Sequence, residues 1–315
     1  MARSKGQVKL IVTIPPTSSP YSDLTDVLRP NRRHWFLEFV ARLFRDKPLG
    51  AAGLVVVVLL GLMAAFADLV APYAYDEQIL AESLEGYSWR HFLGTDQMGR
   101  DLFTRVIYGA RTSLIVGISC VLLSTSTAVL FGVLSGYFGG IIDTVCQRFV
   151  DAFMTIPDLV FVLTLMAVFG PGLLNIILSL SVVSFFWNTR VIRGEVLSLR
   201  ENQYIEAARS VGASDLRIML KYILPNCVAP IIVLSSIRIG GFILGEASIS
   251  FLGFGIPPPL PTWGGMLTGA GVTYMLRAPW LAIWPGVALS LTVFSFNMLG
   301  DGMRDLLDPR LRGSQ

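Results

Sequence analysis

The chain has 315 residues, of which 53% are hydrophobic and only 15% are charged, and its formal net charge is +3. Its mean hydropathy of +0.62 lies far from the balance of a soluble globular protein and excludes that class. We therefore expect an all-α integral membrane protein that contacts the lipid bilayer and has no nucleic-acid partner.

Six charge-poor stretches are long enough to cross a bilayer, since a hydrocarbon layer of about 30 Å requires roughly 20 apolar residues in a helix. We accordingly predict six transmembrane helices. The predicted helices cover residues 49–67, 112–138, 143–169, 173–188, 226–248 and 280–299.

The predicted organisation follows from these spans. Residues 1–48 form a cytoplasmic N-terminal segment that ends in an interfacial helix, where aromatic and aliphatic residues recur at helical spacing between basic ones. Residues 49–71 hold the first transmembrane helix, and residues 72–110 form an external loop. Residues 111–313 form the core, which contains five transmembrane helices and a cytoplasmic loop at 200–225.

The distribution of lysine and arginine gives the orientation, because cytoplasmic loops carry the excess of basic residues. Basic residues are dense before the first span, in the 190–221 region and in the C-terminal tail. We expect both termini and the 200–225 loop to be cytoplasmic. No cleavable signal peptide is expected, because the apolar run at 9–14 is too short.

The loop between the fourth and fifth spans reads as two short helices with a hinge. Residues 204–211 form the first helix, and Gly212 can adopt the left-handed conformation that ends helices. Ser214 or Asp215 can cap the second helix, and Pro225 stops its hydrogen bonding where the fifth span begins. The small side chains of Ala207, Ala208 and Ala213 would let another protein approach closely. The alternative is a plain amphipathic linker.

This loop resembles the signature cytoplasmic loop of ABC importer permeases. That signature consists of Glu-Ala-Ala, a glycine four residues later, and Leu-Pro. The corresponding residues are Glu206, Ala207, Ala208, Gly212, Leu224 and Pro225, while Tyr222 stands where isoleucine is frequent. The resemblance implies that the loop is a coupling helix docked on an ATP-hydrolysing subunit, with Arg209, Ala213 and Asp215 also in the contact.

Three further segments resemble the dipeptide, oligopeptide and nickel branch of these permeases, which have the type I importer fold. They are HFLGTDQMGRDLFTRVIYGARTSLIVG (91–117), LGEASISFLGFGIPPPLPTWGGML (244–267) and the closing PGVALSLTVFSFNMLGDGMRDLLDPRLRG. The resemblance implies a bacterial or archaeal cytoplasmic membrane location. It also implies a second homologous permease subunit, two ATP-binding subunits and an extracytoplasmic substrate-binding protein. None of these segments separates peptides from nickel complexes or oligosaccharides.

Two charged residues fall inside the fifth span, where charge is costly and therefore informative. Arg238, near mid-bilayer, either lines the pathway or pairs with another subunit, and Glu246 could help to close an external gate. The Gly- and Pro-rich stretch after this span must leave the helix as an external loop. This loop, with Pro258 and Trp263, either contacts an external protein or packs on the chain itself.

No phosphate-binding G-x-x-x-x-G-K-[ST] loop occurs, so the chain itself is not expected to bind ATP. There is also no catalytic triad and no metal-ligand pattern. We expect a non-catalytic permease subunit that binds no cofactor, while ATP and Mg are used by partner subunits. The alternatives are a secondary transporter or channel subunit without an ATPase, and a membrane scaffold.

Overall fold

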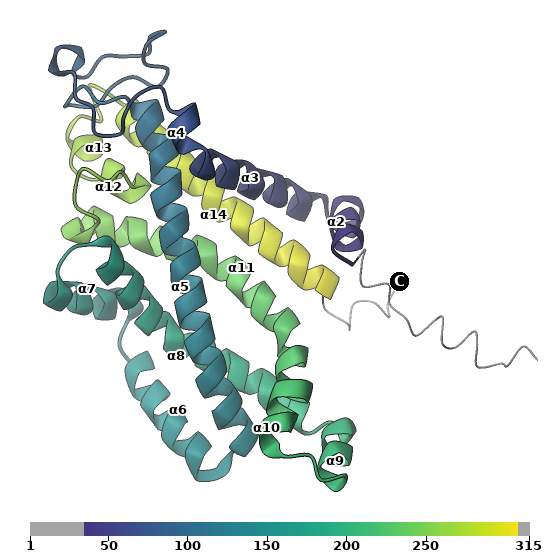
Figure 1. Cartoon of the computed structure of the whole chain (residues 1–315). Coiled ribbons are helices and arrows are strands. Elements are labelled where there is room, and N and C mark those ends of the chain that lie inside the picture. The colour runs from purple at the N-terminus through teal and green to yellow at the C-terminus, as the bar shows by residue number, and fades with distance from the viewer. Residues whose placement is uncertain (1–34, 308–315) are drawn as a thin grey trace, which may run out of the picture. The chain divides into compact units, whose positions relative to one another are not determined.

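The computed structural model describes residues 35–307, and within this range the chain is helical without a named strand (Figure 1). The first 34 residues and the closing Asp-Pro-Arg element at 308–310 lie outside the described residues. Residues from Arg42 onward form one compact unit. The principal helices are α2 (Trp35–Asp46), α3 (Pro48–Ala65), α4 (Ala67–Val70), α5 (Leu102–Phe138), α6 (Gly140–Met154), α7 (Asp158–Phe169), α8 (Leu173–Arg200), α9 (Gln203–Ser210), α10 (Asp215–Ile218), α11 (Leu224–Ile249), α12 (Trp263–Leu267), α13 (Ala270–Thr273) and α14 (Trp280–Leu307).

Five helical stretches of the described chain are long and apolar enough to cross a membrane, and a sixth exists if α6 and α7 count as one broken span. The predicted span over 143–169 is broken in the structure, where α6 and α7 meet at an angle of 86°. Pro157 stands at the break and precedes α7. Proline has no backbone N–H and its ring clashes with the preceding turn, so the helix ends before it.

Helix α5 begins ten residues earlier than predicted, which shortens the loop predicted at 72–110. Asp101 is the N-cap residue, and its carboxylate accepts a hydrogen bond from the backbone N–H of Thr104 at 2.7 Å. The predicted span began after Arg111 because it was limited to charge-poor residues, and this excluded the segment that holds Arg105 and Arg111. Both side chains are satisfied within the chain: Arg105 donates to the carbonyl of Tyr75 and Arg111 to that of Ala64.

Several other helices also extend beyond the predicted spans. Helix α8 continues to Arg200 and α14 to Leu307. Helix α10 does not end before α11, because the π-helical turn η2 (Met219–Ile223) joins the two. Pro225 lies in the first turn of α11, directly after η2, and the backbone stays helical across it. The second short helix of the predicted loop is thus continuous with the fifth span.

Packing in the compact unit centres on α5, which lies along α8, while α14 packs on both α3 and α11. Glycines allow these close approaches. A Cβ on Gly132 would lie 3.0 Å from the Cβ of Ile192, and one on Gly136 would lie 2.9 Å from the Cβ of Val196. The Gly-x-x-x-Gly spacing of these two residues of α5 is therefore a packing element against α8.

Candidate functional site

The segment from Gln203 to Pro225 holds the predicted coupling residues at one end of the compact unit. Figure 1 shows α9 and α10 at the end of α5 opposite to α12 and α13. Helix α9 ends at Ser210, and Gly212, two residues further on, has a φ of +80° in the left-handed region, as predicted. Around it, the backbone N–H of Ala213 donates to the carbonyl of Ala208 at 3.0 Å, and that of Gly212 donates to Arg209 at 2.9 Å.

The inner face of this segment is apolar and packs on α5 and α8. Its buried side chains join those of Tyr137 and Val196 in one hydrophobic cluster. Ala208 belongs to this buried face and is therefore not available to another protein, contrary to the prediction that grouped it with Ala207. The buried residues contributed by the segment are Ile205, Ala208, Ile218, Met219 and Ile223.

Tyr137, at the end of α5, fixes the turn between the two short helices. Its hydroxyl donates to the Asp215 carboxylate at 2.5 Å, and the Arg209 guanidinium lies over its ring, 5.3 Å from the centroid. Asp215 is thus held by Tyr137, and neither Ser214 nor Asp215 caps α10 through its side chain. Two of the predicted coupling residues therefore connect the turn to α5.

The outer face of the segment combines exposed apolar side chains with charges. Val211 is 85% exposed and Leu216 is 63% exposed, and Leu220 is also exposed. We call these three residues the outer apolar patch. The remaining exposed predicted residues around it are Glu206, Ala207, Arg209, Gly212, Asp215 and Pro225, while Ala213 and Leu224 are half-buried. The sequence reasoning did not single out the patch, although three apolar residues in a charged loop were a usable signal.

The two deep charges of α11 have different environments. Arg238 is half-buried and lines a cavity of about 320 Å³ together with Asp158 and Ser184. Glu246 is fully buried and accepts a hydrogen bond from the Ser250 hydroxyl at 2.6 Å. Arg238 thus lines a cavity, whereas Glu246 lies inside the packed chain.

The loop after α11 packs partly on the chain itself. Trp263 is fully buried, and its Nε1 donates to the carbonyl of Val106 at 3.0 Å. Trp263 is thus not available to an external protein, because α5 already covers it. Pro258 is exposed and remains a candidate contact residue.

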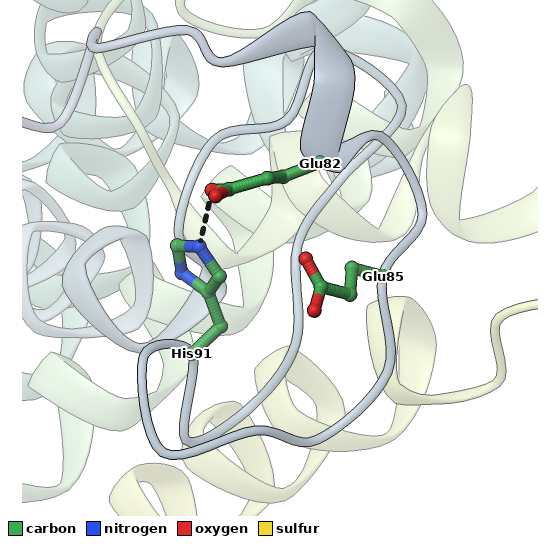
Figure 2. Close-up of side chains that lie close together, drawn as sticks. All are labelled: Glu82, Glu85 and His91. Carbon is green, nitrogen blue, oxygen red and sulfur yellow. Dashed lines mark hydrogen bonds and ion pairs between the residues drawn. The ribbon is translucent and has the colours of Figure 1, made fainter.

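An ion-pair cluster holds the loop before α5, and the sequence reasoning gave its residues no role of their own. The buried His91 ring lies 2.8 Å from the Glu82 carboxylate at Nε2 (Figure 2), and 2.8 Å from the Asp101 carboxylate at Nδ1. Glu85 lies close enough for the three side chains Glu82, Glu85 and His91 to offer metal ligands. Each ring nitrogen of His91 contacts a carboxylate of the same chain. We call this group of three residues, Glu82, His91 and Asp101, the clasp.

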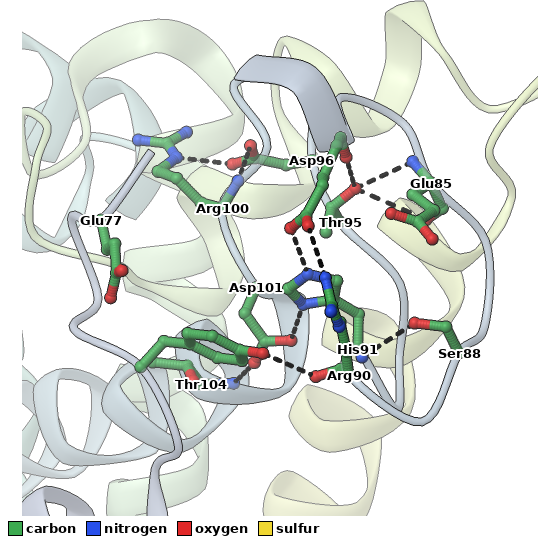
Figure 3. Close-up of polar contacts among 12 residues, drawn as sticks. Glu77, Glu85, Ser88, Arg90, His91, Thr95, Asp96, Arg100, Asp101 and Thr104 are labelled. Atoms are coloured by element: carbon green, nitrogen blue, oxygen red, sulfur yellow. Dashed lines mark hydrogen bonds and ion pairs between the residues drawn. The ribbon is translucent and has the colours of Figure 1, made fainter. Parts of the chain in front are cut away.

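The neighbouring carboxylates shift the pKa of His91. Burial lowers the pKa of His91, but the hydrogen bonds to the Glu82 and Asp101 carboxylates outweigh it and hold the pKa above its ordinary value. In the adjoining network the Thr95 hydroxyl contacts the backbone of Glu82 and of Glu85. Figure 3 shows Thr95 beside Glu85, and Asp96 bound to Arg100. The motif at 94–101 thus builds the loop in front of α5.

A helical membrane unit with this helix–turn–helix between two spans has the architecture of an ABC importer permease. The inward-facing methionine ABC transporter MetNI has a related fold: a TM-score of 0.53 with 19% identity, over 65% of this chain and 96% of that one. This likeness shows the fold alone.

Sequence comparisons identify the family. Residues 128–313 match the model of the binding-protein-dependent transport system inner membrane component, and residues 36–86 match the N-terminal TM domain of oligopeptide transport permease C. The chain is 41% identical to the glutathione transport system permease protein GsiD of Pectobacterium atrosepticum, over 87% of this chain and 91% of that one. It is 37% identical to the dipeptide transport system permease protein DppC of Alkalihalophilus pseudofirmus, over 96% and 98%. The chain therefore belongs to the family of binding-protein-dependent inner membrane components, the permeases of ABC importers.

Proposed function

We propose that the chain is a permease subunit of an ATP-driven importer for peptides or similar solutes in a bacterial or archaeal cytoplasmic membrane. The Gln203–Pro225 segment faces the cytoplasm and docks on an ATP-hydrolysing subunit. The observation that supports this most directly is the outer apolar patch. Its residues Val211 and Leu216 are exposed, while the opposite face of the same segment is buried against α5 and α8.

The path for coupling is the continuous helical stretch from Asp215 through η2 to the end of α11 at Ile249. A force on α10 acts on α11 without an intervening loop, because η2 keeps the backbone helical between them. ATP binding in the partner would favour one arrangement of α11 over another, and the energy difference has to pass through the docked segment. The Arg238 cavity on α11 would change with it.

The partners follow from the same role. The assembly would contain a second homologous permease subunit, two ATP-binding subunits that use ATP and Mg, and an extracytoplasmic substrate-binding protein. This chain would contribute no catalytic residue and no cofactor site. The names of its relatives, a glutathione and a dipeptide permease, support a peptide-like cargo.

The docking role is tested by charge substitution on the outer apolar patch. Val211→Asp and Leu216→Asp place a carboxylate where an apolar contact would be desolvated, so each should reduce co-purification of the ATP-binding subunits and solute-stimulated ATPase activity by about tenfold or more. Gly212→Pro and Glu206→Lys should also impair both.

The matched control is Leu276→Asp, at an exposed apolar position between α13 and α14. It should leave co-purification unchanged. If the patch variants are expressed, folded and still retain the ATP-binding subunits with full transport, the segment is not the docking site and a transporter without an ATPase becomes the better account.

A further inference from the structure

A cavity of about 510 Å³ lies at the opposite end of the compact unit from the docking segment. Its walls come from the loop before α5, the first turn of α5 and the 258–281 region, so segments far apart in the sequence enclose it. A volume of this size suits a small solute of a few residues. Pro258, the exposed candidate from the sequence, lies in its wall.

The charges that line the cavity do not balance. Only three of its lining residues are charged, namely Asp96, Arg100 and Arg105. Their side chains are only 6%, 9% and 10% exposed, so solvent screens them poorly. Two guanidinium groups share one carboxylate, which leaves an excess of one positive charge. A buried, uncompensated charge is costly, and an anion in the cavity would relieve it.

Hydrogen-bond donors also remain for such an anion. Arg100 binds Asp96 through Nε at 2.6 Å, and Figure 3 shows this as the guanidinium's contact with that carboxylate. Its two terminal nitrogens have no hydrogen-bond partner among residues 35–307. Arginine with two free terminal nitrogens matches the geometry of a carboxylate.

We propose that this cavity binds a carboxylate group, with Arg100 as its principal partner. Asp96 fixes the position of the Arg100 side chain through its ion pair with Nε. Arg105 adds a second positive charge, with its Nε 3.7 Å from the Asp96 carboxylate. The carboxylate belongs either to a small solute or to an acidic side chain of a protein docked on this face. Both sources share the same chemistry.

The test uses the intact transporter in nanodiscs, without nucleotide or binding protein. Isothermal titration calorimetry compares N-acetyl-dialanine with its C-terminal amide, which has nearly the same shape but no charge. The acid should bind, and the amide should bind about tenfold more weakly or not at all. Arg100→Gln should weaken acid binding to a similar extent.

A second pair of variants tests the same proposal at a position where substitution should not impair folding. Met98 is 39% exposed and lines the cavity, so both Glu and Gln are tolerated there. Met98→Glu supplies a tethered carboxylate and should lower the affinity for the acid about tenfold relative to Met98→Gln. Arg90→Gln, which removes an exposed positive charge outside the cavity, should leave the affinity unchanged.

The source is resolved by adding the binding protein. If a docked side chain supplies the carboxylate, docking displaces the acid probe; if a solute supplies it, the probe's affinity is unaffected. The proposal is overturned if the acid and amide bind alike, if neither binds at about 20 mM, or if Met98→Glu and Met98→Gln behave alike. None of these results bears on the docking of ATP-binding subunits at Val211.

Discussion

His91 carries the most evident pH-dependent interaction outside the predicted spans. It is buried between the carboxylates of Glu82 and Asp101, and these hydrogen bonds hold its pKa above 6.5 in the folded chain despite the opposing effect of burial. A raised pKa means that the folded loop binds the proton more tightly than the unfolded loop does. The stabilisation is therefore fully present below the unfolded pKa and is lost as the pH rises through the folded pKa.

We expect the 80–101 loop to be better protected from hydrogen exchange at about pH 6 than at about pH 8.5, after correction for the intrinsic exchange rate. His91→Gln should remove this difference because its amide does not titrate. Arg90→Gln is the control, since it leaves the ring between its carboxylates. Equal protection of the native loop at both pH values would contradict the charged clasp.

Glycines govern packing at the scale of the helices. Gly53 of α3 lies against α14, where an added Cβ would be 2.6 Å from the carbonyl oxygen of Ser295, while a Cβ on Gly61 of the same helix would meet nothing within 4 Å. Backbone atoms of α14 cannot yield locally, so a methyl group at Gly53 must push the two helices apart.

Gly53→Ala should therefore lower the free energy of unfolding by about 1–3 kcal/mol. Gly61→Ala should be neutral or slightly stabilising, because alanine favours the helix by about 1 kcal/mol over glycine. Thermal unfolding of the two variants in the same detergent measures the contrast. If both variants unfold at the same temperature, α3 and α14 are not in the close contact described.

Hydropathy predicted the position of the helices because each span must be apolar throughout, and glycine chemistry predicted the hinge at Gly212. Hydropathy did not predict the size of the bend between α6 and α7 or the continuity of α10 with α11, since both depend on the neighbours that stabilise each backbone path. The burial of Trp263 and Glu246 was equally hidden, because an apolar or charged residue near a helix end does not reveal which element covers it.

The candidate site was predicted only in part, because burial depends on which neighbouring elements cover each residue. The resemblance located the docking segment, but the division between its inner and outer faces depends on where α5 and α8 lie. Ala208 therefore turned out to be buried and Val211 exposed. The cavity around Arg100 combines the loop before α5 with the 258–281 region, and a contact between segments more than 150 residues apart left no local signal.

In the whole molecule, the proposed coupling requires that an ATP-binding subunit binds the outer apolar patch. Two residues of the patch, Leu216 and Leu220, lie on the helical stretch that begins at Asp215 and continues into α11, so movement there would reach the cavity around Arg238. Sequence similarity alone supports the class of transporter, whereas the mechanical role rests on this surface.

The most direct measurement is site-specific cross-linking in the intact transporter, with cysteine introduced by Val211→Cys or, as the control, by Leu276→Cys. The account predicts that the cysteine at Val211 forms a cross-link to the ATP-binding subunit whose yield changes when ATP is bound, while the control forms none. A transporter that imports normally but gives no cross-link from Val211 in any nucleotide state would contradict it.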